Sequence, residues 1–274
     1  PTRLPVQRLV RRHRTALAAA VVLPVAVASG ALMSSMRQMD GSDGPSVSSP
    51  APEDPDEMPL PLTSYPGVEA DPAWSPDGRQ VAFVWNGKTG KDFDIYVLTL
   101  GESEPRRLTT AEGADLQPAW SPDGRWIAYQ RGPDPAGFWS VHLVSSAGGE
   151  DRELLRRAAP VGDVEWSRDG RSLIVQMVRT SRRVADLWKV PLDGGIPRRV
   201  TRAPDDIVGD MRPALSPDGR MLAFCRKTAW RTAEVFLLEV TPDLEPVGEP
   251  RQATHLGFVD RPVWMPDGSR LLFE

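Results

Sequence analysis

The sequence predicts an all-β protein, a β-propeller of four-stranded blades, because one turn motif recurs along it at a regular spacing. Ser-Pro-Asp-Gly stands at residues 75–78, 121–124 and 216–219, and copies that differ at one position stand at 167–170 and 265–268. Neighbouring copies are about 46 to 49 residues apart, which is the length that a blade of four short strands requires. We therefore predict four complete blades and part of a fifth.

Each copy of the motif has the composition of a tight turn. Pro presets φ at the second position, Asp tolerates the third, and Gly adopts the left-handed conformation at the fourth. Five equivalent copies indicate structure and not catalysis, so we interpret their Asp and Gly as hairpin residues. These turn residues are Asp77, Gly78, Asp123, Gly124, Asp169, Gly170, Asp218, Gly219, Asp267 and Gly268.

A large apolar residue stands directly before each copy, and an apolar triplet begins three residues after its Gly. The triplets predict the second strand of each blade, and the large residues are expected to pack between blades as anchors. We expect the first, innermost strands to be apolar on both faces and the outer strands to be polar on one. The anchors are Trp74, Trp120, Trp166, Leu215 and Trp264.

The fifth unit stops in its second strand, at Glu274. Blades bury their faces only against neighbouring blades, and a closed propeller usually contains more than four and a half of them. We therefore expect an incomplete ring that is truncated at its C-terminus. A small closed ring of four or five blades is the alternative.

The chain ahead of the repeats predicts a membrane tether. Residues 1–14 are a basic cytoplasmic juxtamembrane stretch, residues 15–36 a transmembrane helix or signal-anchor, residues 37–58 a Pro/Ser/Asp-rich disordered linker, and residues 59–274 the propeller. Residues 15–33 carry no charge and would span roughly 28 Å as a helix, close to the thickness of a bilayer core. The preceding arginines should stay cytoplasmic, which places the propeller on the periplasmic side of a bacterial inner membrane.

Two alternatives to a retained anchor remain open. Ala26-Val27-Ala28 has the small residues of a cleavage site, so the segment could be a signal peptide that is removed and leaves a propeller secreted to the periplasm. A buried soluble helix is the other alternative.

The composition excludes several classes of function. The net charge is −4, which gives no reason to expect nucleic acid as a partner. The single cysteine, Cys225, excludes an intrachain disulfide and a cysteine-based metal site. Neither His-Glu-x-x-His, nor Gly-x-Ser-x-Gly, nor a Gly-rich phosphate loop occurs. We therefore expect no catalytic residues, no bound metal and no cofactor in the residues present.

An acidic residue stands three to five positions ahead of each anchor, near the start of each innermost strand. Such carboxylates could form a ring at one mouth of a central channel and bind a cation or a basic peptide. Alternatively, each one caps backbone amides or pairs with an arginine of the motif, such as Arg79 or Arg125. The five residues are Asp71, Asp115, Asp163, Asp210 and Asp260.

The repeat resembles the TolB-type propeller repeat. The resemblance rests on Pro-Ala-Trp-Ser-Pro-Asp-Gly-Arg at 72–79 and 118–125, Asp-Ile-Tyr-Val at 94–97 and Arg-Arg-Leu-Thr at 106–109. It implies a six- or seven-bladed, usually extracytoplasmic propeller that binds other proteins or peptides at one face. The order of basic stretch, span, linker and repeats is similar to that of bacterial sensor-like proteins, in which a winged-helix DNA-binding domain or a serine/threonine kinase precedes the span.

Three functions are compatible with this pattern. The first is a non-catalytic, membrane-tethered extracytoplasmic module that binds a protein or another ligand, as the sensor or interaction part of a larger bacterial protein. The second is the gating propeller of a prolyl-oligopeptidase-type serine peptidase, whose hydrolase domain would lie beyond residue 274. The third is a structural scaffold of the cell envelope. Coding sequence upstream of Pro1 and downstream of Glu274 would discriminate among them.

Overall fold

The computed structural model describes residues 61–87, 90, 92–229 and 231–274. Residues 67–274 form one compact unit. The predicted basic stretch, membrane segment and linker all lie outside the described residues. Within the described part the regular structure is entirely β. That part accordingly contains no helix with the length and apolar character to cross a membrane.

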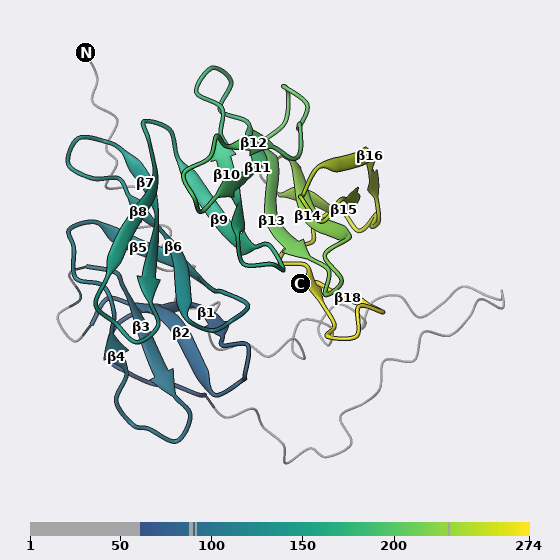
Figure 1. Ribbon diagram of the computed structural model, residues 1–274. Helices are drawn as coiled ribbons and strands as arrows, with labels where there is room; N and C mark the ends of the chain where they lie inside the picture. The colour runs from purple at the N-terminus through teal and green to yellow at the C-terminus, as the bar shows by residue number, and fades with distance from the viewer. Residues whose placement is uncertain (1–60, 88–89, 91, 230) are drawn as a thin grey trace, which may run out of the picture. The chain divides into compact units, whose positions relative to one another are not determined.

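Each repeat of the sequence gives a consecutive set of strands in residues 67–274 (Figure 1). The first set is β1 (Glu69–Trp74), β2 (Gln80–Trp85), β3 (Asp94–Thr99) and β4 (Arg106–Arg107), and the second is β5 (Ala114–Trp120), β6 (Trp126–Gly132), β7 (Trp139–Ser145) and β8 (Asp151–Arg157). The third is β9 (Val161–Trp166), β10 (Ser172–Val178), β11 (Ala185–Pro191) and β12 (Arg198–Arg199), and the fourth is β13 (Gly209–Leu215), β14 (Met221–Ala229), β15 (Thr232–Val240) and β16 (Pro246–Gln252). The fifth repeat contributes β17 (Val263–Trp264) and β18 (Leu271–Leu272).

Within each set, consecutive strands pair antiparallel, as the short turns require. The orders β1-β2-β3-β4 and β5-β6-β7-β8 form two separate sheets, and β17 pairs with β18. The third and fourth sets are joined into one eight-stranded sheet by a single parallel pairing between Ala185 and Gly209. A Cβ added at Gly209 would lie 2.4 Å from backbone atoms of Ala185, so only glycine permits this approach.

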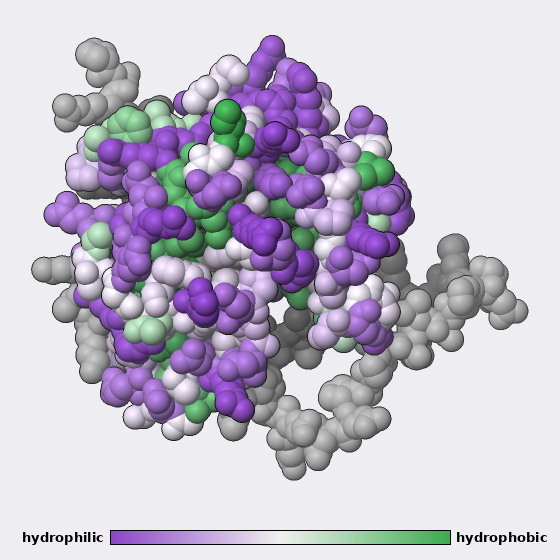
Figure 2. Space-filling view, in the orientation of Figure 1, coloured by the Kyte–Doolittle hydropathy of each residue, from purple (hydrophilic) through white to green (hydrophobic). Residues whose placement is uncertain are grey.

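The core lies between successive repeats and not within any one of them. Each hydrophobic cluster combines residues of two neighbouring sets: Val84 and Ile95 pack with Ile127, for example, and Leu187 packs with Leu222. The first strands β1, β5, β9, β13 and β17 lie next to one another in that order. Apolar side chains are therefore buried only where one repeat covers the next, which is the logic of a repeat protein. The face in Figure 2 is mostly hydrophilic.

One expectation about burial is wrong. The second and third strands are the most buried, because nearly every residue of β2, β3, β6 and β7 is inaccessible to solvent. The first strands were expected to be apolar on both faces, yet β1 and β5 mix buried with partly exposed positions. The reason is a break in their register, which turns polar side chains out of the sheet, as described below.

Candidate functional site

The Asp of each turn is held inside its own turn. Asp77 Oδ1 accepts hydrogen bonds from Ser75 Oγ at 2.6 Å and from the backbone N–H of Arg79 at 3.1 Å. Gly78, with φ of 67°, donates its N–H to Ser75 O at 2.9 Å. These bonds lower the pKa of Asp77. The same bonds recur in the turns of Asp123, Asp169 and Asp218, whereas Asp267 accepts from Ser269. The motif therefore closes hairpins.

Successive turns also pack against one another. A Cβ added to Gly124 would lie 3.8 Å from Pro76 Cδ of the preceding turn, and Gly268 is similarly close to Pro217. The Pro and Gly of the motif thus serve two turns at once, which explains why both recur.

Three of the anchors join neighbouring repeats through their indole N–H groups. Trp120 Nε1 donates to Ala73 O at 2.9 Å, Trp166 Nε1 to Ala119 O at 2.9 Å, and Trp264 Nε1 to Ala214 O at 3.0 Å. In each case the acceptor directly precedes the anchor of the previous repeat. Trp74 belongs to the first repeat and is 57 % exposed. The indole therefore acts as a link between repeats, in addition to filling the core.

The contact between the third and fourth repeats uses a different residue. Its anchor is Leu215, which is buried but has no N–H to donate from its side chain. Arg168, which replaces the motif Pro in the third turn, donates from Nε to Ser216 O at 2.9 Å and from a terminal nitrogen to Leu215 O. The two departures from the motif, at 168 and 215, thus occur at the same contact, and the arginine supplies the hydrogen bonds that the leucine cannot.

The polar candidates centre on one position, three residues before each anchor. Of the residues at this position, Asp71, Gln117, Arg212 and Arg261 have positive φ values of 48°, 55°, 54° and 51°. The register of β1, β5 and β13 with the next strand shifts at the same place, as in a β-bulge. The fifth residue at this position is Asp163. The bulge re-aims these side chains out of the sheet.

The re-aimed side chains form a connected set, which we call the inner polar chain: Gln117, Asp163, Arg212, Asp260, Arg261 and Asp71. Gln117 Nε2 donates to Asp163 Oδ1 at 2.7 Å, and Arg212 donates to the same carboxylate at 2.5 Å. Arg212 Nε also lies 3.3 Å from Asp260 Oδ1. The chain ends where an Arg261 nitrogen lies 3.3 Å from Asp71 Oδ1, which joins the fifth repeat to the first. Charges of both signs therefore alternate along it.

Arg212, at the centre of the inner polar chain, is held in its ionised form by the carboxylates around it. Burial acts to lower the pKa of Arg212, but the carboxylates of Asp163, Asp260 and Asp71 raise it above the ordinary arginine value. Arg212 is therefore a permanent cation among three carboxylates, which it partly neutralises.

Asp115 and Asp210 occupy a different position and are fully buried. Each is the cross-strand partner of an arginine, and each binds it through both carboxylate oxygens: Asp115 with Arg131 at 2.6 and 2.9 Å, Asp210 with Arg226 at 2.7 and 3.0 Å. Burial raises the pKa of both carboxyls, and the bound arginines oppose that rise. These pairs support the fold and are not accessible to a ligand.

The five predicted acidic residues thus fall into separate structural positions. Asp71, Asp163 and Asp260 belong to the inner polar chain, and the other two are buried. The arginines that bind them are Arg131, Arg212, Arg226 and Arg261, not Arg79 or Arg125. No group of three acidic, histidine or cysteine side chains placed to hold a metal ion occurs among the described residues. Cation binding by the five predicted acidic residues stays a prediction.

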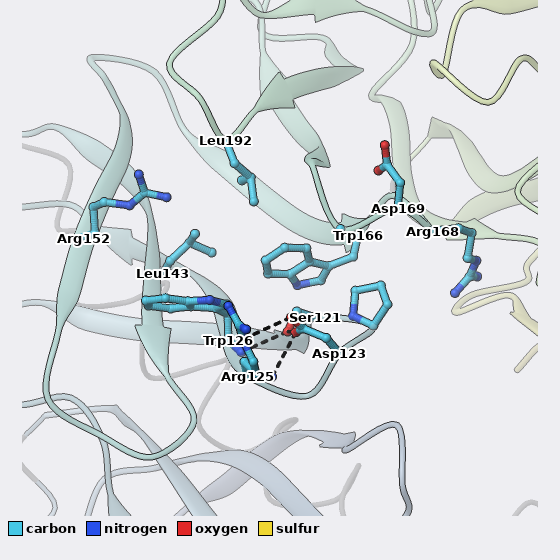
Figure 3. A pocket seen from close by; sticks show the side chains of 12 residues that line it. Ser121, Asp123, Arg125, Trp126, Leu143, Arg152, Trp166, Arg168, Asp169 and Leu192 are labelled. Atoms are coloured by element: carbon cyan, nitrogen blue, oxygen red, sulfur yellow. Dashed lines mark hydrogen bonds and ion pairs between the residues drawn. The ribbon is translucent and has the colours of Figure 1, made fainter.

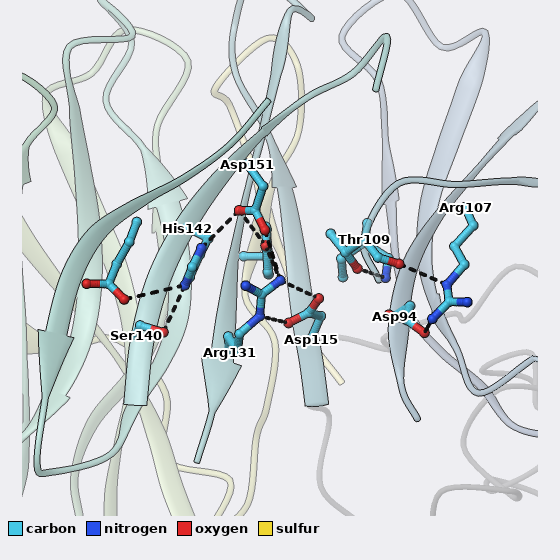
Figure 4. A network of polar contacts seen from close by, with 11 residues as sticks. Asp94, Arg107, Thr109, Asp115, Arg131, Ser140, His142 and Asp151 are labelled. Atoms are coloured by element: carbon cyan, nitrogen blue, oxygen red, sulfur yellow. Dashed lines mark hydrogen bonds and ion pairs between the residues drawn. The ribbon is translucent and has the colours of Figure 1, made fainter. Parts of the chain in front are cut away.

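A second polar network surrounds Arg131, as Figure 4 shows. Its guanidinium lies between Asp115 and Asp151, with the Asp151 contact at 3.0 Å, and donates to Tyr129 Oη at 2.7 Å. Burial alone would raise the pKa of Asp151, but hydrogen bonds from His142 and Tyr129 and the charge of Arg131 lower it to about 2. The network ties strands β5, β6, β7 and β8 together.

His142 extends this network in an arrangement that resembles a catalytic triad. Its Nδ1 lies 2.9 Å from Asp151 Oδ1, and its Nε2 lies 2.9 Å from Ser140 Oγ. Ser140 and His142 are both buried on β7. A substrate carbonyl could not reach the hydroxyl without unpacking the strand, and Asp151 is shared with two further donors. We assign this set to stability and not to catalysis.

The comparisons with known proteins agree with this architecture. The family model described as the TolB β-propeller domain matches residues 60–244. A search of the curated proteins returned no match. Among solved structures, a protein assigned as TolB from Agrobacterium tumefaciens is 22 % identical, with a TM-score of 0.63 over 77 % of this chain and 71 % of that one. TolB from Acinetobacter baumannii is 19 % identical, with a TM-score of 0.61 over 78 % and 50 %.

The likeness extends to enzymes and to a complex outside the TolB proteins. A puromycin-hydrolyzing peptidase of Mycobacterium tuberculosis is 20 % identical, with a TM-score of 0.56 over 76 % of this chain and 34 % of that one. A structure of a nidogen/laminin complex is similar at 14 % identity and a TM-score of 0.56, over 75 % and 71 %. The chain therefore spans about half of one TolB and a third of the peptidase. At these identities the likeness shows the fold alone.

Proposed function

We propose, from the premise that this chain belongs to the TolB β-propeller domain family, that it is a non-catalytic module that binds another protein. We further propose that it is tethered to a bacterial inner membrane with the propeller on the extracytoplasmic side, as the sensing part of a larger protein. The ring that the family implies has six or seven blades. One observation supports the binding role above others, namely the inner polar chain.

The backbone of the inner polar chain is strained at residues that could have been glycine. A left-handed conformation at a non-glycine residue costs about 1–2 kcal/mol, and glycine would avoid that cost. The sequence instead places Asp71, Gln117, Arg212 and Arg261 there. Such strain is typical of residues that are kept for recognition.

The charges of the inner polar chain favour a protein as its partner. Arg261 and Asp260 are partly exposed at its end, so a ligand can reach them. Because cations and carboxylates alternate, the complementary surface must also carry both signs, as protein surfaces do. A simple anion or cation would meet repulsion as well as attraction there, because the chain carries three carboxylates and two guanidinium groups.

The first test concerns which side of the membrane the propeller occupies. Cys225 is buried, and burial together with the nearby Asp260 carboxylate raises the pKa of its thiol to about 12, so the natural protein should resist maleimide labelling. Ile196 is 84 % exposed, and Ile196→Cys should react. We expect a membrane-impermeant maleimide to label this variant in intact spheroplasts. Labelling that required lysis would contradict the proposed orientation.

The second test concerns the binding surface. A photo-crosslinking amino acid at position 261 of the full chain should give one discrete adduct in living cells, identified by mass spectrometry. The same amino acid at Arg251, an exposed position on the outer strand β16, is the control and should give none. Equal adducts at both positions, or none at either, would remove the inner polar chain as the binding surface.

A gating propeller in a serine peptidase is the second candidate. It is supported by the structural likeness to a puromycin-hydrolyzing peptidase. A Gly-x-Ser-x-Gly motif in the coding sequence after Glu274 would favour it, whereas a winged-helix or kinase pattern before Pro1 would favour the sensor.

A further inference from the structure

A cavity of about 450 Å³ lies between the second and third repeats (Figure 3). Trp126 and Leu143 line it from the second repeat, and Trp166 and Leu192 line it from the third. Arg152 lies at one end. The volume is within the range of small-ligand sites, and the lining combines apolar walls with charged groups.

Arg152 belongs to a set of arginines at one register position. Each pairs with the third-strand residue that lies opposite the middle residue of the apolar triplet: Arg106 with Val97, Arg152 with Leu143, Arg198 with Lys189, and Arg251 with Leu237. In the first and third repeats this arginine reaches the following repeat. Arg106 donates to Ser146 O at 2.6 Å, and Arg198 lies 3.2 Å from Glu245 Oε1.

The second repeat lacks this bridge. Within the part of the chain that the structure describes, the side chain of Arg152 forms no hydrogen bond or ion pair, although it is exposed at the edge of the cavity. The third repeat has an additional bridge, from Lys189 Nζ to Asp243 O at 2.7 Å. The corresponding residue in the second repeat is Leu143, which cannot form such a bond. At this register position, side-chain bonds therefore join the first repeat to the second and the third to the fourth, but none joins the second to the third.

The acids that line the cavity are already engaged. Asp123 Oδ1 accepts from Ser121 Oγ at 2.6 Å, and Asp169 Oδ1 accepts from Ser167 Oγ at 2.6 Å. Asp123 also lies 3.3 Å from Arg125. In Figure 3 both acids lie toward the turns, away from Arg152. Two arginines also line the turn end, but both are already bonded: Arg125 to Asp123, and Arg168 to Glu165 at 3.6 Å and to Ser216 O. The guanidinium that is left for an anionic ligand group is therefore that of Arg152.

We propose that this cavity binds a peptide segment in which an apolar side chain adjoins a carboxylate. The apolar side chain would enter between Trp126 and Trp166, against Leu143 and Leu192. The carboxylate would pair with the unbonded guanidinium of Arg152, which suits a two-point contact with a carboxylate. The inference rests on the proposed role as a protein-binding module and identifies a second contact, separate from the inner polar chain.

The test is a titration of the purified full chain with acetyl-Gly-Leu-Phe that has a free C-terminal carboxylate, followed by isothermal calorimetry. We expect Arg152→Gln to weaken binding at least tenfold, since a charge-assisted contact is lost. Arg251→Gln is the matched control, because Arg251 has the same register but lines no part of this cavity, and it should bind as the natural chain does. Because Arg152 is exposed and unbonded, its replacement should leave the circular dichroism spectrum unchanged.

Two further peptides test separately whether the carboxylate and the apolar side chain are required for binding. The C-terminally amidated peptide should bind at least tenfold more weakly to the natural chain, and Arg152→Gln should not weaken it further. Acetyl-Gly-Gly-Gly should not bind detectably, because it lacks the apolar side chain. Equal affinities for the natural chain and Arg152→Gln, or no binding at millimolar peptide, would overturn the proposal. The crosslinking at position 261 is independent of these results, so failure of either can be told from failure of the other.

Discussion

Replacement of Trp120 with alanine is expected to lower the free energy of unfolding by about 3–5 kcal/mol. Trp120 is only 9 % exposed and packs with Val84 and Ile95 of the preceding repeat. Its indole N–H also donates to Ala73 O. The substitution therefore leaves a cavity between two repeats and an acceptor without its donor. Guanidinium denaturation of the full chain, followed by tryptophan fluorescence, measures the loss.

Trp74 provides a matched control for this experiment. It occupies the same position in the first repeat but is 57 % exposed. Trp74→Ala should change the free energy of unfolding by less than about 0.5 kcal/mol, as other exposed substitutions do. Similar losses for the two variants would mean that the anchors do not act between repeats.

The turns and the strands that follow them could be predicted because their determinants are local. Ser, Asp and Gly bind one another within a few residues, as Asp77 does with Ser75 and Arg79, so the tetrapeptide alone carries the information. The same holds for the apolar triplets, which became the buried strands β2, β6, β10 and β14.

The inner polar chain could not be predicted in this way. Arg212 and Arg261 adopt a conformation that glycine and asparagine favour, so nothing in their identity indicates a positive φ. The five acidic residues also occupy three different positions: Asp71 and Asp163 lie three residues before their anchors, Asp260 four, and Asp115 and Asp210 five. When the repeats are aligned on the anchor residue, one position holds Asp71, Gln117, Asp163, Arg212 and Arg261. Only this alignment shows that the arginines occupy the same position as two of the acidic residues.

In contrast, the paired departures from the repeat, Arg168 and Leu215, can be recognised in the sequence. Both residues depart from the repeated pattern, and they do so in consecutive repeats. A repeat protein contacts only its neighbours, so paired departures of this kind point to one shared contact. The bonds from Arg168 to the carbonyls of Leu215 and Ser216 are that contact.

The number of blades in the intact ring and the membrane-spanning segment stay predictions.

Replacement of Arg131 with methionine is the second large effect expected, with a loss of about 3–5 kcal/mol at pH 7. Arg131 is 11 % exposed and binds Asp115, whose side chain is fully buried, as well as Asp151. Methionine can fill the volume, but it leaves the carboxylate of Asp115 in the core without a counter-charge. Arg125→Met is the control, since Arg125 is exposed and its ion pair with Asp123 should contribute less than about 1 kcal/mol.

The loss should depend on pH in a direction that identifies its cause. Burial raises the pKa of Asp115 above its value in the unfolded chain, and removal of Arg131 takes away the charge that opposes this rise. The folded variant therefore binds a proton more readily than the unfolded one, so its stability relative to the natural protein should recover as the pH falls toward about 4. The double variant Asp115→Leu with Arg131→Met should recover stability at pH 7, because no buried charge is then left unpaired. A loss that was the same at pH 7 and pH 4.5, and that persisted in the double variant, would mean that Arg131 stabilises the second repeat by packing and not by its charge.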